Sequence, residues 1–487
     1  MKKSNLFLLK IVAFCLLLKC FIPTLSAQNK SDEIDKLVSK YHEYEQFNGS
    51  VLVSENGKVI YKKGFGMANM EWDILNQSNT KHRLGSVTKQ FTAMLILQLA
   101  EKGKVKLDVP ITTYLPDYPK TNGDQITIHQ LLCHTSGIPN YTSFPDFFKK
   151  DSKNFYTPEE FVKKFADMPL EFKPGEKFAY SNSGYFVLGY IIEKVTGKTY
   201  EQNLQDQIFT PLNMVNAGFD HHETILKNRA TGYEKSGKGF KNADYLDMSI
   251  PFSAGSLYAT VEDLFLWDQA LYTEKLLSAK YLEMMFKPYI AAGPGFYAYG
   301  WGVADVPFGK TKDKLHVVEH TGGINGFNTI ISRIPADKNL IVLLNNTGGA
   351  PLNQMSASIR NILYGQPYEM PKRSFAKALQ SAITEHGIEK GLLNFEKLRK
   401  DSSYDFNENE INSAGYYFLQ SGNVKEAIAI FKINVENFPK SGNAYDSLGE
   451  AYLKDGDKKS AVLNYKKSVA LDPENENGKK VLSEISK

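Results

Sequence analysis

The chain has 487 residues, of which 42% are hydrophobic and 23% charged, and a formal net charge of +4 at pH 7. Four of its 58 basic residues and none of its 54 acidic residues lie within residues 1–27, so the rest of the chain is balanced in charge. That balance argues against nucleic acid or an anionic membrane as the main partner. The length suits two or three domains that each bury a core.

Residues 1–27 have the features of a cleaved secretory signal peptide. Two lysines precede an apolar run over residues 6–18, and residues 25–27 (LSA) provide the small residues of a cleavage site. The apolar run is too short for a transmembrane helix, and no later segment reaches 18 uninterrupted apolar residues. We therefore predict an exported protein, periplasmic or secreted, without a membrane span.

Cysteine usage is consistent with this prediction. Cys15 and Cys20 lie within the predicted signal peptide, so only Cys133 remains in the mature chain. Lys19, which precedes Cys20, fits a lipid-attachment sequence poorly. An exported chain with one thiol has no internal disulfide and must depend on its core for stability.

The predicted elements of residues 28–367 begin and end with β-hairpins. The first covers residues 49–61, where Asn56-Gly57 supplies a turn with positive φ, and the second joins residues 327–334 to residues 340–344. Between them lie mostly helical and loop segments, including the chain's best apolar helix at residues 90–101 (QFTAMLILQLAE). Early and late strands around a helical middle favour an α+β fold, with one antiparallel sheet and helices packed on it.

Ser86 and Lys89 lie at the start of that apolar helix. Side chains three residues apart on a helix point the same way, so the hydroxyl and the amine can share one proton, which makes a serine nucleophilic. A serine in the first turn also has free backbone N–H groups beside it. Two other Ser-x-x-Lys sets begin at Ser78, in a polar stretch, and at Ser374, in a connecting segment; we expect both to be accidental.

Two further motifs follow. Tyr180-Ser181-Asn182 lies in a turn-like run before a helical stretch, and His320-Thr321-Gly322-Gly323 lies in an extended, glycine-rich segment before a predicted strand. The order Ser-x-x-Lys, Tyr-Ser-Asn and His-Thr-Gly resembles the serine acyl-transferring, penicillin-recognising family. That family includes class C β-lactamases, D-alanyl-D-alanine carboxypeptidases, D-aminopeptidases and related esterases. The resemblance covers roughly residues 30 to 365 and implies a sheet of five or more strands, a mostly helical second lobe and a site at their junction.

The resemblance also implies a role for each motif residue. Ser86 is the nucleophile that forms an acyl-enzyme, and Lys89 accepts its proton. Tyr180 activates the deacylating water or relays the leaving-group proton, as a phenol whose pKa nearby cations can lower. Asn182 donates its amide to the acyl-side carbonyl of the substrate and holds Lys89, and the N–H groups of Ser86 and Gly323 make the oxyanion hole. The predicted catalytic residues are thus Ser86, Lys89 and Tyr180, and the predicted substrate-binding residues are Asn182, His320, Thr321, Gly322 and Gly323.

His320 stands where many members of that family have lysine. An unperturbed imidazole titrates at about pH 6.5, so we expect the charge of His320 to change near neutrality. His316 suggests a metal pair, but residues four apart in a strand lie about 13 Å from each other. We therefore expect no metal and no other cofactor. Residues 134–137 (HTSG) echo the third motif but precede the tyrosine motif, which favours a structural loop.

The composition changes after about residue 368. Residues 411–487 contain two stretches that match at a separation of 34, with the second helix of each unit followed by proline. This period is typical of tetratricopeptide repeats, in which small residues let paired helices approach closely. Residues 374–400 have a helical pattern, and residues 368–410 are predicted to form a helical connector or capping unit. The paired positions are Gly415 with Gly449, Gly422 with Gly456, Ala427 with Ala461, Phe431 with Tyr465, and Pro439 with Pro473.

The sequence therefore predicts an exported serine hydrolase that acts through an acyl-enzyme on Ser86. Its small-molecule or peptide substrate is a D-amino-acid peptide, a β-lactam or an ester, and the pattern does not distinguish these. The alternative is a sensor or scaffold with the penicillin-binding fold and little catalysis, whose repeats recruit a protein partner.

Overall fold

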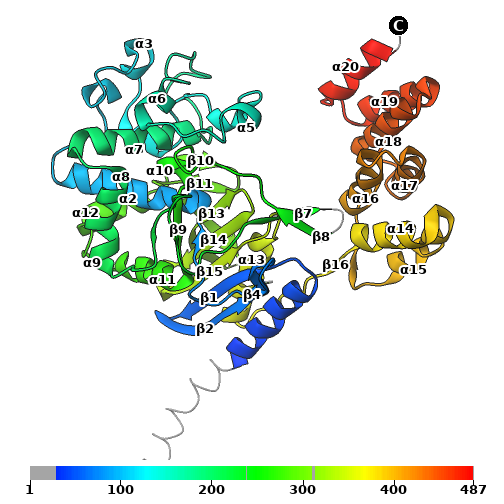
Figure 1. The fold of residues 1–487 in the computed structure, drawn as a ribbon, viewed down its shortest axis with the longest axis horizontal. Coiled ribbons are helices and arrows are strands. Elements are labelled where there is room, and N and C mark those ends of the chain that lie inside the picture. The colour runs from blue at the N-terminus through cyan, green and yellow to red at the C-terminus, as the bar shows by residue number, and fades with distance from the viewer. Residues whose placement is uncertain (1–28, 237–238, 310–312, 486–487) are drawn as a thin grey trace, which may run out of the picture. The chain divides into compact units, whose positions relative to one another are not determined.

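The computed structural model describes residues 29–236, 239–309 and 313–485 (Figure 1). The predicted signal peptide lies outside these ranges. The chain divides into two compact units, the first ending at Met370 and the second beginning at Pro371. Among the described helices, none has the length and apolar character needed to cross a bilayer.

An antiparallel sheet of eight strands forms the centre of the first unit as far as it is described. Both predicted hairpins are present in it, and Asn56 and Gly57 have the positive φ values (52° and 73°) that the first turn requires. The α+β prediction is confirmed. In spatial order the strands are β10 (Ile290–Ala292), β11 (Gly295–Tyr297), β12 (Gly302–Pro307), β13 (Lys314–Ile324), β14 (Phe327–Ile334), β15 (Asn339–Asn345), β1 (Gly49–Glu55) and β2 (Lys58–Phe65).

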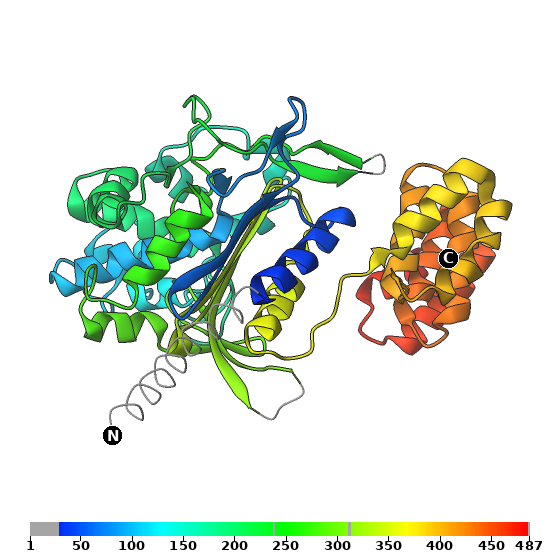
Figure 2. The same cartoon turned by 90° about the horizontal axis from the view of Figure 1, so that it is seen from below.

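Strands β1 and β15 are buried on both faces, because side chains alternate between two cores. Val51 and Leu343 pack with a helix at residues 29–43 and with α13 (Leu352–Leu363). Leu52 and Leu344 belong instead to the larger core of the helical lobe. Figure 2 shows the sheet between these two layers.

The predicted apolar helix is α2 (Thr88–Glu101), which is buried on nearly every side. It packs against α7 (Asn182–Thr196) and α10 (Phe252–Gly255) in the core of the lobe. The turn that precedes it, η1 (Gly85–Val87), carries Ser86 and lies against β13. The nucleophile predicted from the sequence is thus placed where the helical lobe meets the sheet.

Gly322 makes this close approach possible. A Cβ added at Gly322 would lie 2.0 Å from the Leu84 carbonyl oxygen and 2.2 Å from Thr329 Oγ1. The Thr329 hydroxyl donates a hydrogen bond of 2.7 Å to the same carbonyl, which ties the turn to the sheet. Gly85 has a φ of 55°, and a Cβ added there would lie 2.8 Å from the backbone nitrogen of Gly323.

The second unit is helical apart from a short parallel bridge between β16 (Arg373–Ser374) and β17 (Tyr404–Asp405). Its two matching stretches form two helix pairs, in which a Cβ on Gly415 would strike the Phe431 ring and one on Gly449 would touch the Tyr465 ring. Small residues thus let paired helices approach closely. The helices of this unit are α14 (Phe375–Leu393), α15 (Phe395–Lys400), α16 (Glu408–Gln420), α17 (Val424–Asn437), α18 (Gly442–Asp455), α19 (Lys458–Leu471) and α20 (Glu476–Ile485).

Replacing Gly322 by alanine should lower the free energy of unfolding by roughly 1–3 kcal/mol, because the added methyl group meets backbone that cannot move freely. Gly323→Ala is the matched control, since its Cβ would find its nearest neighbour, Asn328 Nδ2, only at 3.9 Å. Urea denaturation of both variants measures the difference. Equal stability of the two variants would show that the turn is not tied to the sheet at Gly322.

Candidate active site

Ser86 and Lys89 meet as the sequence predicts. Lys89 Nζ lies 3.1 Å from Ser86 Oγ, 2.8 Å from Asn182 Oδ1 and 2.9 Å from the carbonyl oxygen of Ala254. These partners come from η1, α7 and α10, so one amine joins three segments that are far apart in the sequence. The prediction that Asn182 holds Lys89 agrees with this geometry.

The burial of Lys89 prepares it to accept a proton. Its side chain is fully buried, and this desolvation holds the pKa of the amine well below its usual range. A neutral amine has two N–H groups and one lone pair. Asn182 Oδ1 and the Ala254 carbonyl accept hydrogen bonds and cannot donate them, so they take the two N–H groups. The lone pair then faces the Ser86 hydroxyl, which is the arrangement that a general base needs.

Tyr180 lies beside this pair, immediately before α7. Lys89 Nζ is 4.8 Å from the centre of the Tyr180 ring. Burial raises the pKa of the phenol well above its usual value, and only the proximity of Ser86 lowers it. The expectation that nearby cations depress this pKa is therefore wrong, because desolvation of the phenolate is the dominant effect and no cation is among the groups that lower the pKa. Among the described groups the hydroxyl has no partner in hydrogen-bond geometry.

Asn182 is held in place from several sides. It is the first residue of α7, and its own N–H donates to Asn140 Oδ1 at 3.1 Å. Its side-chain amide lies 3.4 Å from Asn140 Oδ1 and 3.5 Å from Thr142 Oγ1, at the long end of the hydrogen-bond range. The amide therefore has donor capacity left for a substrate carbonyl.

His134 belongs to the site, although the sequence suggested only a structural loop for residues 134–137. Its ring lies 4.2 Å from the ring of Tyr180, and its Nδ1 accepts a hydrogen bond from the N–H of Ser181. Burial and the nearby Lys89 hold the pKa of His134 well below its usual range, so the ring is neutral. Through its contacts with Tyr180 and Ser181, this neutral ring supports the Tyr180-Ser181-Asn182 motif. The likeness of residues 134–137 (HTSG) to the His-Thr-Gly motif was the sequence signal from which His134 could have been predicted.

His320 faces the interior, and both ring nitrogens have protein partners. Nδ1 lies 2.6 Å from the Thr321 carbonyl, so it carries the proton, and Nε2 accepts from the Tyr297 hydroxyl at 2.9 Å. Burial, and next Lys89, lower the pKa of His320 to about 4. The expected titration near neutrality is therefore wrong, and the ring is uncharged at pH 7. Thr321 is exposed on the same strand.

A pocket of about 130 Å³ opens beside Ser86 and is lined by Ser86, Asn182 and Gly323 among others. Gly322 is buried under the turn, whereas Gly323 is exposed, so its N–H has room for a substrate oxygen. The structure thus brings Ser86, Lys89, Tyr180, Asn182 and Gly323 to one junction, with Gly322 under the turn and with His320 and Thr321 on the same strand.

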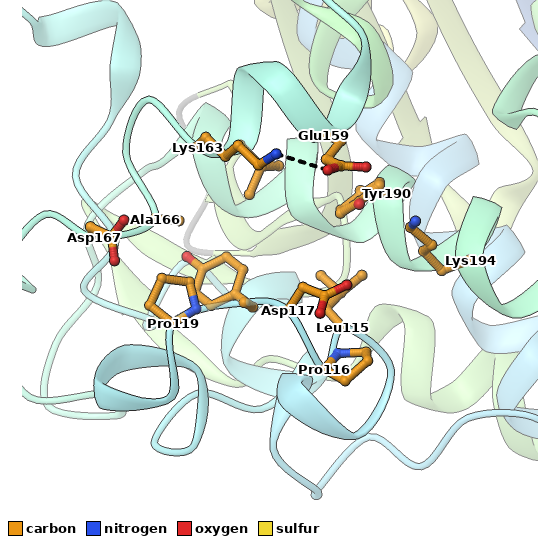
Figure 3. Close-up of a pocket in the computed structure, with 12 residues that line it drawn as sticks. Leu115, Pro116, Asp117, Pro119, Glu159, Lys163, Ala166, Asp167, Tyr190 and Lys194 are labelled. Atoms are coloured by element: carbon orange, nitrogen blue, oxygen red, sulfur yellow. Dashed lines mark hydrogen bonds and ion pairs between the residues drawn. The ribbon is translucent and has the colours of Figure 1, made fainter.

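A larger pocket of about 370 Å³ lies elsewhere on the helical lobe. Figure 3 shows it between the Leu115–Pro119 segment and helices that carry Glu159 and Tyr190, with an ion pair of 2.8 Å between Lys163 and Glu159 at its rim. None of the motif residues lines it, so it has no part in the chemistry described above.

The pKa of His320 predicts a change of stability with pH. The folded chain favours the neutral ring, whereas the unfolded chain binds a proton near pH 6.5, so this contribution is complete above 6.5 and is lost as the pH falls to about 4. The loss amounts to about 3 kcal/mol. His320→Gln, which can keep both hydrogen bonds, should therefore lose less stability between pH 6.5 and 4 than the wild type.

Chemical denaturation at several pH values measures this slope. His316→Gln is the matched control, because His316 lies on the same strand but is exposed. The remaining buried histidines keep part of the slope in every variant. If stability fell equally with pH in the wild type and in His320→Gln, the pKa of His320 would be the same in the folded and the unfolded chain, which contradicts the prediction.

Comparisons with known proteins agree with this geometry. The family model described as Beta-lactamase matches residues 34–363. Penicillin-binding protein 4* of Bacillus subtilis is 31% identical over 386 residues, which cover 73% of this chain and 82% of that protein. The teichoic acid D-alanine hydrolase of Staphylococcus aureus is 31% identical over 276 residues, 56% of this chain and 66% of that protein.

Among solved structures, the D-amino acid amidase of Ochrobactrum anthropi SV3 superposes with a TM-score of 0.58 at 25% identity, covering 70% of this chain and 98% of the amidase chain. The family match extends over well more than half of the chain and includes all the motif residues. The chain therefore belongs to the β-lactamase family of serine hydrolases.

Proposed function

We propose that the protein is exported and hydrolyses its substrate through an acyl-enzyme on Ser86, with Lys89 as the base for acylation. The observation that carries the proposal is the 3.1 Å contact between Lys89 Nζ and Ser86 Oγ, in a setting where both N–H groups of a neutral amine have other acceptors. The substrate classes are those that the family offers: D-amino-acid peptides, β-lactams and esters.

The acylation step follows from these positions. Ser86 Oγ attacks the acyl carbon while its proton passes to Lys89 Nζ, and the negative charge develops on the carbonyl oxygen. The N–H groups of Ser86 and Gly323 stabilise that oxygen, and the Asn182 amide donates to the acyl side of the substrate. The bond between the acyl carbon and the leaving group then breaks as the carbonyl re-forms, and the proton returns from Lys89 through Tyr180 to the leaving group. Water next attacks the acyl carbon, and the ester bond breaks as Ser86 Oγ regains a proton.

The relatives support this proposal without choosing the substrate. One is named for removing D-alanine from teichoic acid and another for cleaving D-amino acid amides, so both act on acyl groups with D configuration. The first 27 residues, with their two leading lysines, apolar run and small-residue cleavage site, support export to the periplasm or the medium.

We also propose that the chain consists of a signal peptide at 1–27, a hydrolase domain at 28–367, a helical connector at 368–410 and tetratricopeptide-like repeats at 411–487. Matching glycine contacts in the two helix pairs, at Gly415 and Gly449, support the repeat assignment. Gly422 and Gly456 also match, since both end a first helix with a positive φ. Such repeats bind peptide or protein segments, so a protein partner is the proposed role of this unit.

Ser86→Ala should abolish covalent labelling, because no other serine among the described residues has a buried amine in hydrogen-bond reach. The measurement is intact mass after exposure to a penicillin, a D-alanyl-D-alanine peptide, an activated ester or a fluorophosphonate. Ser78→Ala is the matched control, since Ser78 begins another Ser-x-x-Lys set but bonds Glu262 instead. Undiminished labelling of Ser86→Ala would place the nucleophile elsewhere. Labelling of the wild type without any turnover would favour the sensor alternative.

Ending the chain after Met370 should leave hydrolysis of a small ester largely intact, because every motif residue lies in the first unit. Rates of the full-length and shortened proteins are compared after circular dichroism has verified that both are folded. A folded, shortened enzyme that is more than about tenfold slower, equivalent to about 1.4 kcal/mol of barrier, would show that the second unit helps to build the site.

A further inference from the structure

The pocket beside Ser86 differs from the rest of the site in that its walls are apolar. It is lined by several segments that are far apart in the sequence, and three of them, at residues 141–148, 246–250 and 324–325, contribute aromatic rings or branched aliphatic groups. The apolar walls are Tyr141, Phe147, Phe148, Leu246, Ile250 and Ile324.

The pocket is also free of charge. Among the described residues that line it, none is acidic or basic, and the polar ones are Ser86, Asn182, Thr142 and Asn325. The Asn325 side-chain N–H already donates to the Asp244 carbonyl at 2.8 Å. A carboxylate or ammonium group placed here would lose its hydration without gaining an ion partner, which is strongly unfavourable.

Charged side chains that neighbour the lining residues in the sequence have partners outside this pocket. Lys149 and Lys150 follow Phe148 but are exposed to solvent, and both approach Asp146, at 3.5 and 3.3 Å. Asp247 follows Leu246, and its Oδ1 accepts hydrogen bonds from the N–H and hydroxyl of Ser249. These groups therefore leave the pocket itself uncharged.

The position of the pocket assigns it to the acyl side of the substrate. Ser86, which becomes acylated, lines it together with Asn182 and Gly323, the groups proposed to hold the acyl carbonyl. A substituent on the acyl carbon therefore extends into the pocket. Its volume of about 130 Å³ is that of about four water molecules in the liquid, which suits a short chain.

Resting on the proposed function of Ser86, we infer that this enzyme selects substrates whose acyl group is short, apolar and uncharged, and discriminates against acyl groups that carry a carboxylate. Tyr141, Phe147, Phe148, Leu246, Ile250 and Ile324 determine this specificity. Neutral esters and amides of apolar acids are thus favoured over substrates with an acidic acyl side chain.

A matched pair of esters tests the inference. p-Nitrophenyl butyrate and the p-nitrophenyl monoester of succinic acid share a leaving group and a four-carbon acyl chain, and they differ by a terminal carboxylate. We expect kcat/KM to be at least about tenfold higher for the butyrate, because the pocket cannot compensate a buried carboxylate. The acetate, which leaves the pocket empty, should also be slower than the butyrate.

Phe148→Lys places a cation at the pocket without disturbing the core, since Phe148 is 55% exposed. It should shift the butyrate-to-succinate ratio of kcat/KM at least about tenfold towards the charged ester. Phe155→Lys is the matched control, because Phe155 is also exposed but does not line this pocket, and its ratio should equal that of the wild type.

The outcomes are distinguishable. If the wild type hydrolyses the charged ester as fast as the butyrate while Ser86 is still labelled, the inference is wrong and the proposed function stands. A ratio unchanged by Phe148→Lys likewise contradicts the assignment of the pocket to the acyl group. If neither ester is hydrolysed and Ser86 is not labelled, the proposed function fails and the inference fails with it.

Discussion

The structure of the site depends on one buried amine. Lys89 lies on a helix with almost no exposed side chains, and its Nζ contacts groups from the turn before α2, from α7 and from α10. A charged ammonium group would be very costly there, so the amine is held neutral and its three positions are filled by two acceptors and one hydroxyl. The same contacts therefore hold three segments together and orient the Ser86 hydroxyl.

Burial makes the surroundings of this amine neutral as well. His320 and His134 both have lowered pKa values, partly because Lys89 lies close to them, and Tyr180 has a raised pKa. Each of these groups is consequently uncharged near pH 7. A site of this kind gains little from attraction to charged substrates and depends on the close fit of neutral groups. The pocket beside Ser86 is likewise uncharged, because none of its described lining residues is acidic or basic.

Part of this arrangement follows from local sequence patterns. The hairpin at residues 49–61, the apolar helix and the shared face of Ser86 and Lys89 depend on turn chemistry, periodicity and helix geometry, which act over a few residues. The pKa of His320 could not be predicted this way, because it depends on Tyr297 and Lys89, which reach it through the fold. His134 was missed for the same reason, since its contact with Tyr180 joins two loops.

The high pKa of Tyr180 constrains how the acyl-enzyme of the proposed function is hydrolysed. A phenol that keeps its proton near pH 7 cannot act as a general base, so Tyr180 cannot deprotonate the attacking water by itself. It can pass a proton on only while a neighbour accepts one, and the neighbouring acceptor is Lys89, whose Nζ lies 4.8 Å from the ring centre. In the proposed function, Tyr180 and Lys89 would therefore act together, with the buried amine taking up the proton and the phenol passing it on to the leaving group.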